Sequence, residues 1–329
     1  MPDAPAVPSV WAISDGAAGN ARQALALATA LGLAPLEMRI RVRAPWRWLA
    51  PRLTTGASHA FVPRPAAPWP DIAIGCGRQA ALLTRVLRAW SGGSTFCVQI
   101  LDPRVDAAAF DVVVAPRHDA VTGANAIATL GALNPVDANW LQRARMEFST
   151  LQQLPQPRTA LLVGGPRRGL GLDAAWLERF IARLRALLER DGGSLMIALS
   201  RRTPPDWHAR LHGAFDNGCV HFWGSPADGP NPYPGYLAWA ERIVVTPDSV
   251  NMLSEACATG VPVLSSLPAG AHGRIAAFHA ALRETRQLHE LDAVELSTLP
   301  HCEPLRETAA VAAQVWQRYQ ARAASAPAG

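Results

Sequence analysis

The chain has 329 residues, of which 49% are hydrophobic and 17% charged, so a disordered chain is excluded and two domains of about 150 residues each are expected. Its apolar runs are far shorter than the roughly 20 residues that span a bilayer, and the N-terminus lacks a signal-peptide pattern, so we predict a cytoplasmic protein. The sequence contains no lysine, and this excludes a Walker-type phosphate loop and a Schiff-base mechanism. The net charge is +5, but no nucleic-acid-binding motif is found.

The five cysteines are scattered, without a C-x-x-C pair. Their spacing matches neither a zinc site nor a disulfide framework, so each is expected to be a small buried side chain. We predict no bound metal and no cofactor.

Short apolar runs alternate with amphipathic segments, a pattern typical of parallel sheets with right-handed crossovers. In the first half we expect strands at 10–14, 71–75, 95–101 and 112–115, and helices at 21–31 and 78–90. In the second half we expect strands at 159–163, 194–199, 243–246 and 261–265, helices at 174–189, 206–215, 250–259 and 274–283, and a last helix at 304–322.

A polar run with two prolines at 152–158 marks the predicted break between the halves. We predict an N-terminal Rossmann-like, acceptor-side domain over 1–151 and a Rossmann-like nucleotide-binding domain over 152–303. A closing helix with a frayed tail follows over 304–329. This α/β pattern resembles the GT-B architecture of glycosyltransferases, in which ligands bind in the cleft between the two domains.

The block 246–263 predicts a strand, a turn and a helix whose N-terminus attracts an anion. Asp248, Ser249 or Asn251 is expected to cap this helix. Glu255, about two turns into the helix, is placed to accept hydrogen bonds from a ribose diol. The alternative is an ordinary strand–helix–strand unit in which Glu255 faces solvent.

A glycine turn follows the strand predicted at 159–163. Gly164 and Gly165 lack a Cβ, so their backbone is expected to approach a diphosphate closely. Arg167 and Arg168 would add charge-assisted hydrogen bonds to the phosphates.

The loop after the first strand also carries glycines and polar side chains. Asp15 is a candidate general base, and Asn20 and Gln23 are candidates for bonding a sugar or phosphate. The alternative is a simple helix cap. At two later predicted strand ends, Asp102 and the neighbouring pair His118 and Asp119 are further candidates for proton transfer.

Arginines alternate with large apolar side chains between Arg39 and Arg52, where Trp46, Trp48 and Leu49 lie. One interpretation of this composition is a peripheral contact with the inner face of the cytoplasmic membrane, although a segment broken by prolines is a poor amphipathic helix. A solvated basic edge with half-buried tryptophans is the alternative.

Several of these motifs together resemble those of the mitochondrial fission Elm family, a divergent branch of the GT-B superfamily. The resemblance lies in residues 15–23, 75–78, 99–103, 110–119, 164–166, 231–233 and 246–263. It implies a GT-B fold; some family members carry a nucleotide-sugar epimerase label, and plant members are tied to mitochondrial division. The family's first loop often has a histidine where this chain has Asn20, so the catalytic base would have to be Asp15 or the pair His118 and Asp119, or activity would be absent.

The motifs and the resemblance together place the candidate site residues in two groups. The group implied to bind the donor nucleotide and its diphosphate is Gly164, Gly165, Arg167, Asp248, Ser249, Asn251, Met252, Ser254 and Glu255. The group implied for the acceptor side or the cleft is Gly16, Gly19, Asn20, Gln23, Gly77, Arg78, Asp102, Asn231 and Tyr233.

The favoured interpretation is a metal-independent, inverting glycosyltransferase that uses a nucleotide-activated sugar and acts on an envelope lipid or saccharide. A sugar-nucleotide 2-epimerase of the same fold and a non-catalytic scaffold remain the alternatives. The sequence indicates no nucleic-acid partner.

Overall fold

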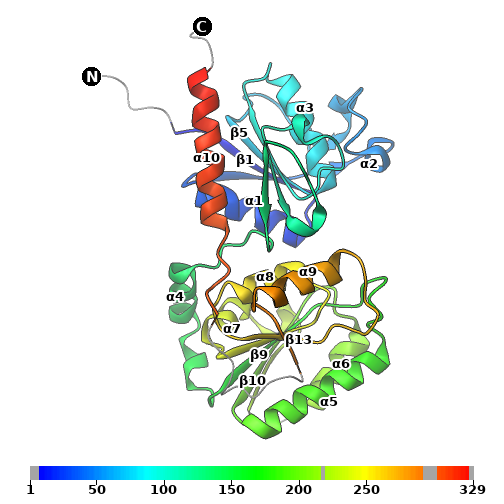
Figure 1. Cartoon of the computed structure of the whole chain (residues 1–329), viewed down its shortest axis with the longest axis vertical. Coiled ribbons are helices and arrows are strands. Elements are labelled where there is room, and N and C mark those ends of the chain that lie inside the picture. The colour runs from blue at the N-terminus through cyan, green and yellow to red at the C-terminus, as the bar shows by residue number, and fades with distance from the viewer. Residues whose placement is uncertain (1–6, 216–218, 292–301, 326–329) are drawn as a thin grey trace, which may run out of the picture. The chain divides into compact units, whose positions relative to one another are not determined.

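The structure is a computed structural model that describes residues 7–215, 219–291 and 302–325. The chain forms two compact units, one made of Met1–Pro135 with Arg306–Gly329 and the other of Val136–Leu305. Each unit has a six-stranded parallel sheet with helices on both faces, which is a Rossmann-like arrangement (Figure 1).

The first unit has the strand order β2-β1-β5-β6-β7-β8. Its sheet strands are β1 (Val10–Ser14), β2 (Pro35–Arg39), β5 (Ile72–Cys76), β6 (Phe96–Ile100), β7 (Val112–Pro116) and β8 (Ala126–Thr129). Its helices are α1 (Ala18–Ala30), α2 (Trp46–Leu49), α3 (Arg78–Trp90) and α10 (Thr308–Ser325). A separate antiparallel pair joins β3 (Arg41–Val42) to β4 (Phe61–Val62).

Successive side chains of each strand point to opposite faces of the sheet, and both faces are buried at the central strands because helices cover them. One face packs against α1 and α10, in a core that includes Ile74, Leu27 and Val315. The other face packs against α3 and the segment around β3 and β4, in a core that includes Ile13 and Leu83. Strand interiors therefore read as continuous apolar runs, as the sequence pattern predicts.

The second unit has the strand order β11-β10-β9-β12-β13-β14. Its strands are β9 (Arg158–Val163), β10 (Ser194–Leu199), β11 (Val220–Trp223), β12 (Arg242–Val245), β13 (Val263–Ser265) and β14 (His289–Glu290). Its helices are α4 (Ala138–Glu147), α5 (Ala174–Asp191), α6 (Pro205–Ala214), α7 (Tyr233–Trp239), α8 (Val250–Cys257) and α9 (Arg274–Glu284). A large apolar cluster lies between this sheet and helices α5 and α6, where Trp176, Phe180 and Trp207 stack.

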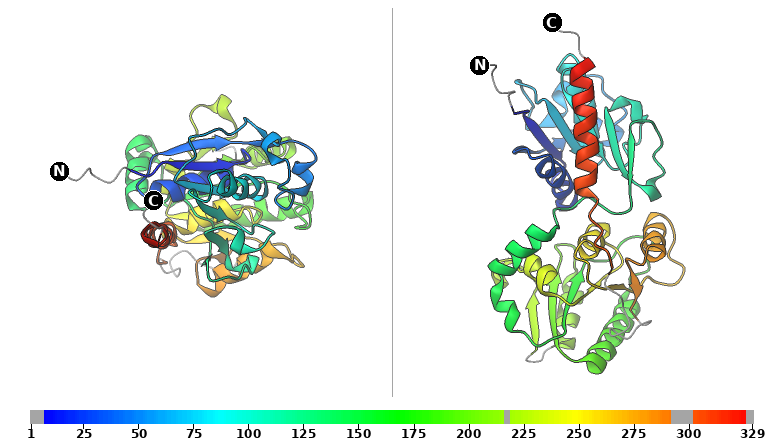
Figure 2. Two further views of the ribbon diagram at one scale, coloured as in Figure 1. Left: turned by 90° about the horizontal axis from the view of Figure 1, so that it is seen from above. Right: turned by 60° about the vertical axis from the view of Figure 1, so that its left-hand side comes forward.

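The last helix belongs to the first unit, although the sequence places it after the second. The right view of Figure 2 shows α10 against the first sheet, and its residues share a core with α1. Its start is fixed by Glu307, whose carboxylate accepts hydrogen bonds from the backbone of Leu130 and Gly131. At its other end Arg322 pairs with Asp111 at 2.9 Å.

The boundary between the units falls at Pro135 and Val136, ahead of the break predicted at 151 and 152. The physical reason is that α4 packs against α7 of the second unit. Arg145 of α4 donates to the Ala238 carbonyl of α7 at 2.8 Å. The polar, proline-containing run at 152–158 thus lies inside the second unit, where Arg158 already belongs to β9.

A buried arginine ties the amino ends of two central strands of the second unit. Arg242 of β12 is 0% exposed, donates to the Thr159 hydroxyl of β9 at 2.6 Å, and pairs with Asp191 at the end of α5. Removing one partner of such a pair leaves the other charge buried without compensation.

We therefore expect Arg242→Met to lower the free energy of unfolding by about 3 kcal/mol, measured by urea denaturation. The matched control is Arg210→Ala, which breaks an exposed pair with Glu178 and should change it by less than about 1 kcal/mol. Equal effects of the two substitutions would contradict a structural role for the buried pair.

Candidate functional site

The candidate site lies where the strand order of the second sheet reverses direction. Strand β9 is central, β10 and β11 follow on one side, and β12 begins the other side. In doubly wound sheets, ligands bind outside the carboxyl ends of the strands at this point. The glycine turn after β9 and the turn before α8 meet there.

The centre of this site is a buried carboxylate. Asp248 is 1% exposed, and its Oδ1 accepts from the Thr246 hydroxyl at 2.8 Å. Its Oδ2 accepts from the backbone N–H of Gly165 at 3.2 Å and from Arg202 Nη2 at 2.7 Å. The Thr246 hydroxyl in turn accepts from the backbone N–H of Gly164 at 2.7 Å. The carboxylate therefore connects the loops that follow β9, β10 and β12.

The two glycines leave room for the protein's own groups. A Cβ on Gly164 would lie 2.2 Å from both Asp248 carboxylate oxygens, and a Cβ on Gly165 would lie 2.2 Å from the Arg202 carbonyl oxygen. Internal packing thus explains why both positions are glycine. Contact of this turn with a diphosphate stays a prediction.

Exposed arginines surround the buried carboxylate. Arg167 Nη1 donates to the Asp248 carbonyl at 3.4 Å, while the Arg202 side chain is 52% exposed and pairs with the Asp248 carboxylate. Arg168 and Arg201 are exposed beside them in sequence. Sequence reasoning did not select Arg202. No local signal marks this residue, because its partner Asp248 lies 46 positions away in the sequence.

Helix α8 begins directly beside Asp248. Ser249 is its N-cap and accepts from the backbone N–H of Met252 at 3.4 Å, so of the three predicted caps Ser249 fills that role. Asn251 lies half-buried in the first turn. Ser254 is buried and donates back to the Val250 carbonyl at 2.8 Å. The helix N-terminus adds positive potential to that of the arginines.

Glu255 is buried in this structure. It is 2% exposed, and one carboxylate oxygen accepts from the Tyr233 hydroxyl at 2.5 Å. The alternative that Glu255 faces solvent is therefore wrong. Asn231 accepts from the Tyr233 backbone N–H at 3.0 Å at the start of α7, so Asn231 and Tyr233 lie with the predicted nucleotide-binding residues of the second unit.

A buried histidine supports the turn that carries Asp248. His279 of α9 is fully buried, and its Nε2 donates to the Pro247 carbonyl at 3.0 Å. Burial lowers the pKa of His279 to about 4, and the nearby Arg283 acts in the same direction. The ring is thus neutral at neutral pH. The sequence showed only an isolated histidine at this position.

In the first unit, some of the predicted residues gather at the corresponding reversal between β1 and β5. Asn20 donates to Asp15 Oδ1 at 3.0 Å, and Asp15 also accepts from the Ala17 backbone at 3.1 Å. A Cβ on Gly77 would lie 2.5 Å from the Asn20 amide nitrogen. Gly16 has φ +81°, which allows the sharp turn after β1. Asn20 thus holds Asp15 within the loop, whereas the N-cap of α1 is Ala17, without a side-chain cap hydrogen bond.

The remaining first-unit candidates have other surroundings. Arg78 donates to the carbonyls of Trp48 and Ala50, at 3.3 and 3.1 Å. Asp102 accepts from the backbone of Arg104 at 2.8 Å, as in a simple turn. The others are Gly19 and Gln23 on α1, and His118 and Asp119 in a short 3-10 turn after β7. Their catalytic or binding roles stay predictions.

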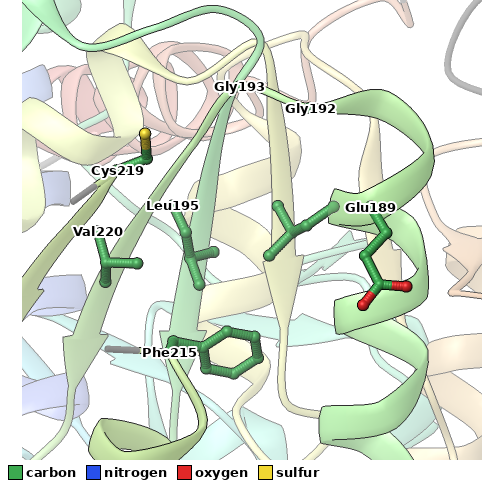
Figure 3. Close-up of a pocket in the computed structure, with 8 residues that line it drawn as sticks. Glu189, Gly192, Gly193, Leu195, Phe215, Cys219 and Val220 are labelled. Carbon is green, nitrogen blue, oxygen red and sulfur yellow. The ribbon is translucent and has the colours of Figure 1, made fainter. Parts of the chain in front are cut away.

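A cavity of about 280 Å³ lies at the opposite, amino-terminal edge of the second sheet (Figure 3). It is lined by apolar side chains that include Leu195, Phe215 and Val220, with Glu189 and Cys219 at its rim. None of the predicted site residues lines it. Across the ranges that the structure describes, no group of three or more acidic, histidine or cysteine side chains is placed to hold a metal ion.

Comparison with known proteins gives a match over nearly the whole chain. Residues 18–319 match the sequence model of the family described as mitochondrial fission ELM1. The mitochondrial fission protein ELM1 of Arabidopsis thaliana is 30% identical over 279 residues, which cover 77% of this chain. The chain spans less than two thirds of that relative, because the alignment covers 65% of the plant protein.

Solved structures share the fold at low sequence identity. S. aureus MnaA with UDP has a TM-score of 0.56 and 11% identity, covering 98% of this chain and 99% of that one. The UDP-GlcNAc 2-epimerase of Methanocaldococcus jannaschii has a TM-score of 0.53 and 10% identity, covering 88% of each chain. The kitacinnamycin glycotransferase has a TM-score of 0.50 and 13% identity, covering 96% and 94%. The predicted fold class, with two Rossmann-like domains of the GT-B type, is confirmed.

The close packing at Gly164 gives a stability prediction. We expect Gly164→Ala to destabilise the protein by about 1–3 kcal/mol, because the new methyl group must displace the Asp248 carboxylate. Gly213→Ala is the control: this glycine lies on α6 with open space around its Cβ position, and the change should stabilise by about 0.5–1 kcal/mol. Chemical denaturation measures both. A Gly164→Ala variant with the same free energy of unfolding as the unaltered chain would show that the contact between Gly164 and Asp248 is not tight.

The buried histidine gives a pH prediction. The unfolded chain takes up a proton at His279 near its ordinary pKa of about 6.5, whereas the folded chain does so only near pH 4. Stability should therefore fall as the pH drops through this window, by about 3 kcal/mol from this group. Comparing His279→Gln with the unaltered chain isolates the effect, since the other groups titrate in both. An equally steep loss of stability in the variant would contradict the prediction.

Proposed function

We propose that this chain, which belongs to the mitochondrial fission ELM1 family, binds a nucleoside-diphosphate sugar at the carboxyl edge of its second sheet. The observation that carries the proposal is the convergence of Arg167 and Arg202 on Asp248, next to the N-terminus of α8. This cluster lies where the strand order reverses, the position at which doubly wound sheets bind nucleotides.

The charges of the cluster suit a diphosphate. The buried Asp248 carboxylate is compensated by Arg202 and by the Gly165 backbone N–H, so the exposed parts of Arg167 and Arg202 face solvent with net positive charge. Guanidinium groups bind phosphate oxygens with two parallel hydrogen bonds, and the helix dipole adds to this attraction.

Asp248 has a positioning role in this proposal. Its carboxylate fixes Arg202 and the glycine turn, so that the cations are in place before the ligand arrives. Binding then requires little reordering of side chains, which lowers its entropic cost. Glu255, held by Tyr233, is proposed to meet the ribose, as the resemblance to GT-B enzymes implies.

The proposed reaction is transfer of the sugar with inversion. The bond between the anomeric carbon and the diphosphate oxygen breaks, and its electron pair leaves with the diphosphate, where Arg167 and Arg202 stabilise the developing charge. An acceptor hydroxyl forms the new bond to that carbon and gives its proton to a base, for which Asp15 and the pair His118 and Asp119 are the candidates. An envelope lipid or saccharide is the proposed acceptor.

Two observations favour other outcomes. Solved structures of the same fold include a UDP-GlcNAc 2-epimerase. If this chain were an epimerase, it would convert the donor sugar without any acceptor. The plant relative carries the name of a mitochondrial fission protein, which favours a scaffold. Incubation with a nucleotide sugar alone separates these cases: a mass-neutral product indicates the epimerase, and unchanged donor without nucleotide binding indicates the scaffold.

The binding proposal is tested by calorimetry with uridine, cytidine and guanosine diphosphates. We expect binding of at least one, and a roughly 10- to 100-fold weaker affinity for Arg167→Ala, because a charge-assisted hydrogen bond contributes about 1.5–3 kcal/mol. Arg167 contacts the Asp248 carbonyl and not its carboxylate, so this variant leaves the buried charge paired.

Arg210→Ala is the control for removing one exposed arginine from the same unit, and it should bind as the unaltered chain does. Arg202→Lys tests the second cation while keeping a positive charge beside Asp248. Absence of binding for all three diphosphates, or full affinity of both Arg167→Ala and Arg202→Lys, would rule the site out.

A further inference from the structure

We infer that residues 38–70 of the first unit, called here the basic segment, form a docking surface for an anionic lipid membrane. The segment contains six arginines and no aspartate or glutamate: Arg39, Arg41, Arg43, Arg47, Arg52 and Arg64. Its formal charge is therefore +6, whereas the whole chain carries +5. All other residues together have a net charge of −1, so the excess positive charge of this protein is confined to one tenth of its length.

The arginines of the basic segment lie at the surface. All six are exposed, and the nearest acidic residue before them, Glu37, pairs with Arg39 alone. Within α3, which packs under the segment, Arg78 and Arg85 add two further positive charges. The positive potential is thus continuous from the underlying helix to the exposed arginines.

Two large apolar side chains are exposed among these arginines. Trp48 is 71% exposed and Leu49 is 50% exposed, both on the short helix α2 at the periphery of the first unit (Figure 1). Adjacent exposed apolar groups ringed by cations are unfavourable in water but suit a membrane interface, where the ring lies at headgroup depth and the guanidinium groups meet phosphates.

The exposed tip is held in place by the rest of the unit. Arg78 donates to the carbonyls of Trp48 and Ala50, and Arg85 donates to the carbonyl of Pro51. Trp46 Nε1 donates to the Thr55 carbonyl at 2.8 Å, which closes the loop. The backbone that carries Trp48 and Leu49 is therefore anchored to α3, and both side chains lie at the surface.

The charge and the apolar tip together select a lipid surface over a nucleic acid. Phosphate contacts alone would require only the arginines, and Leu49 has no role in stacking on bases. An anionic bilayer uses both parts: each arginine near it contributes through the surface potential, and the tryptophan and leucine enter the interface. This surface is separate from the proposed nucleotide site and does not depend on it.

The test is co-sedimentation of the full chain with vesicles of phosphatidylcholine alone and with vesicles of phosphatidylcholine and phosphatidylglycerol. We expect binding to the anionic vesicles only, and loss of binding at high salt, because the exposed charges are screened. The double variant with Arg43→Glu and Arg47→Glu should have a partition coefficient at least about tenfold lower, because each arginine near a charged surface contributes to binding. The double variant with Trp48→Ser and Leu49→Ser should also bind the anionic vesicles more weakly.

Matched controls come from the second unit. Arg143→Glu with Arg179→Glu makes the same change in net charge at exposed positions of α4 and α5. Met146→Ser removes an apolar side chain that is 65% exposed. Neither control should change vesicle binding by more than about twofold. Unchanged thermal unfolding of all variants shows that each is folded.

Three results would overturn the inference. The first is absence of binding to anionic vesicles at low salt. The second is equal loss of binding in the control variants, since then net charge alone would govern it. The third is binding of an oligonucleotide that depends on Arg43 and Arg47 while vesicles are not bound, which would assign the segment to nucleic acid.

Discussion

A single buried carboxylate determines how the second unit is built at the carboxyl edge of its sheet. Asp248 has almost no exposure to solvent, so its charge must be compensated by hydrogen bonds and a cation. The partners come from three loops: the Gly165 N–H after β9, Arg202 after β10 and the Thr246 hydroxyl after β12. Each loop is thereby held against the others, and the start of α8 is fixed as well. Gly164 must lack a side chain because the carboxylate occupies the space of its Cβ.

The central strands follow from the sequence, because they are buried on both faces and read as apolar runs. The edge strands β2, β8, β11 and β14 are partly exposed and were not predicted. Strand β10 and helix α3 have the predicted bounds, and α8 ends at Cys257, slightly before the predicted end. The assignment of segments to units was harder to predict. Helix α4 was not predicted, and nothing local in its sequence identifies the helix it packs against, which is α7. Helix α10 was predicted, but the sequence did not identify its partner, which is α1 in the first unit.

The site was predictable where its signals are local in sequence. A glycine pair after a strand and a serine at a helix start are local, so Gly164, Gly165 and Ser249 could be selected with their neighbours. The residues that support them are distant: Arg202 lies 46 positions from its partner Asp248, and His279 lies 32 positions from Pro247. No spacing rule connects such pairs. Glu255 shows a further limit, because periodicity left its environment open, whereas the structure buries it against Tyr233.

The two anion-attracting regions differ in how salt should affect them. The arginines of the basic segment are exposed and have no buried carboxylate among them, so their attraction to a charged surface is long-ranged and strongly screened. In the proposed nucleotide site, Arg202 is fixed by a buried partner and Arg167 lies against the Asp248 backbone, so a bound diphosphate would be held by short, directed hydrogen bonds that salt weakens less. Because the two sets of arginines belong to different units, a charge change in one leaves the short-range contacts of the other intact. Binding to a membrane and binding to a nucleotide are therefore separable by salt and by mutation, and their coupling can be measured as the change in one affinity when the other ligand is present.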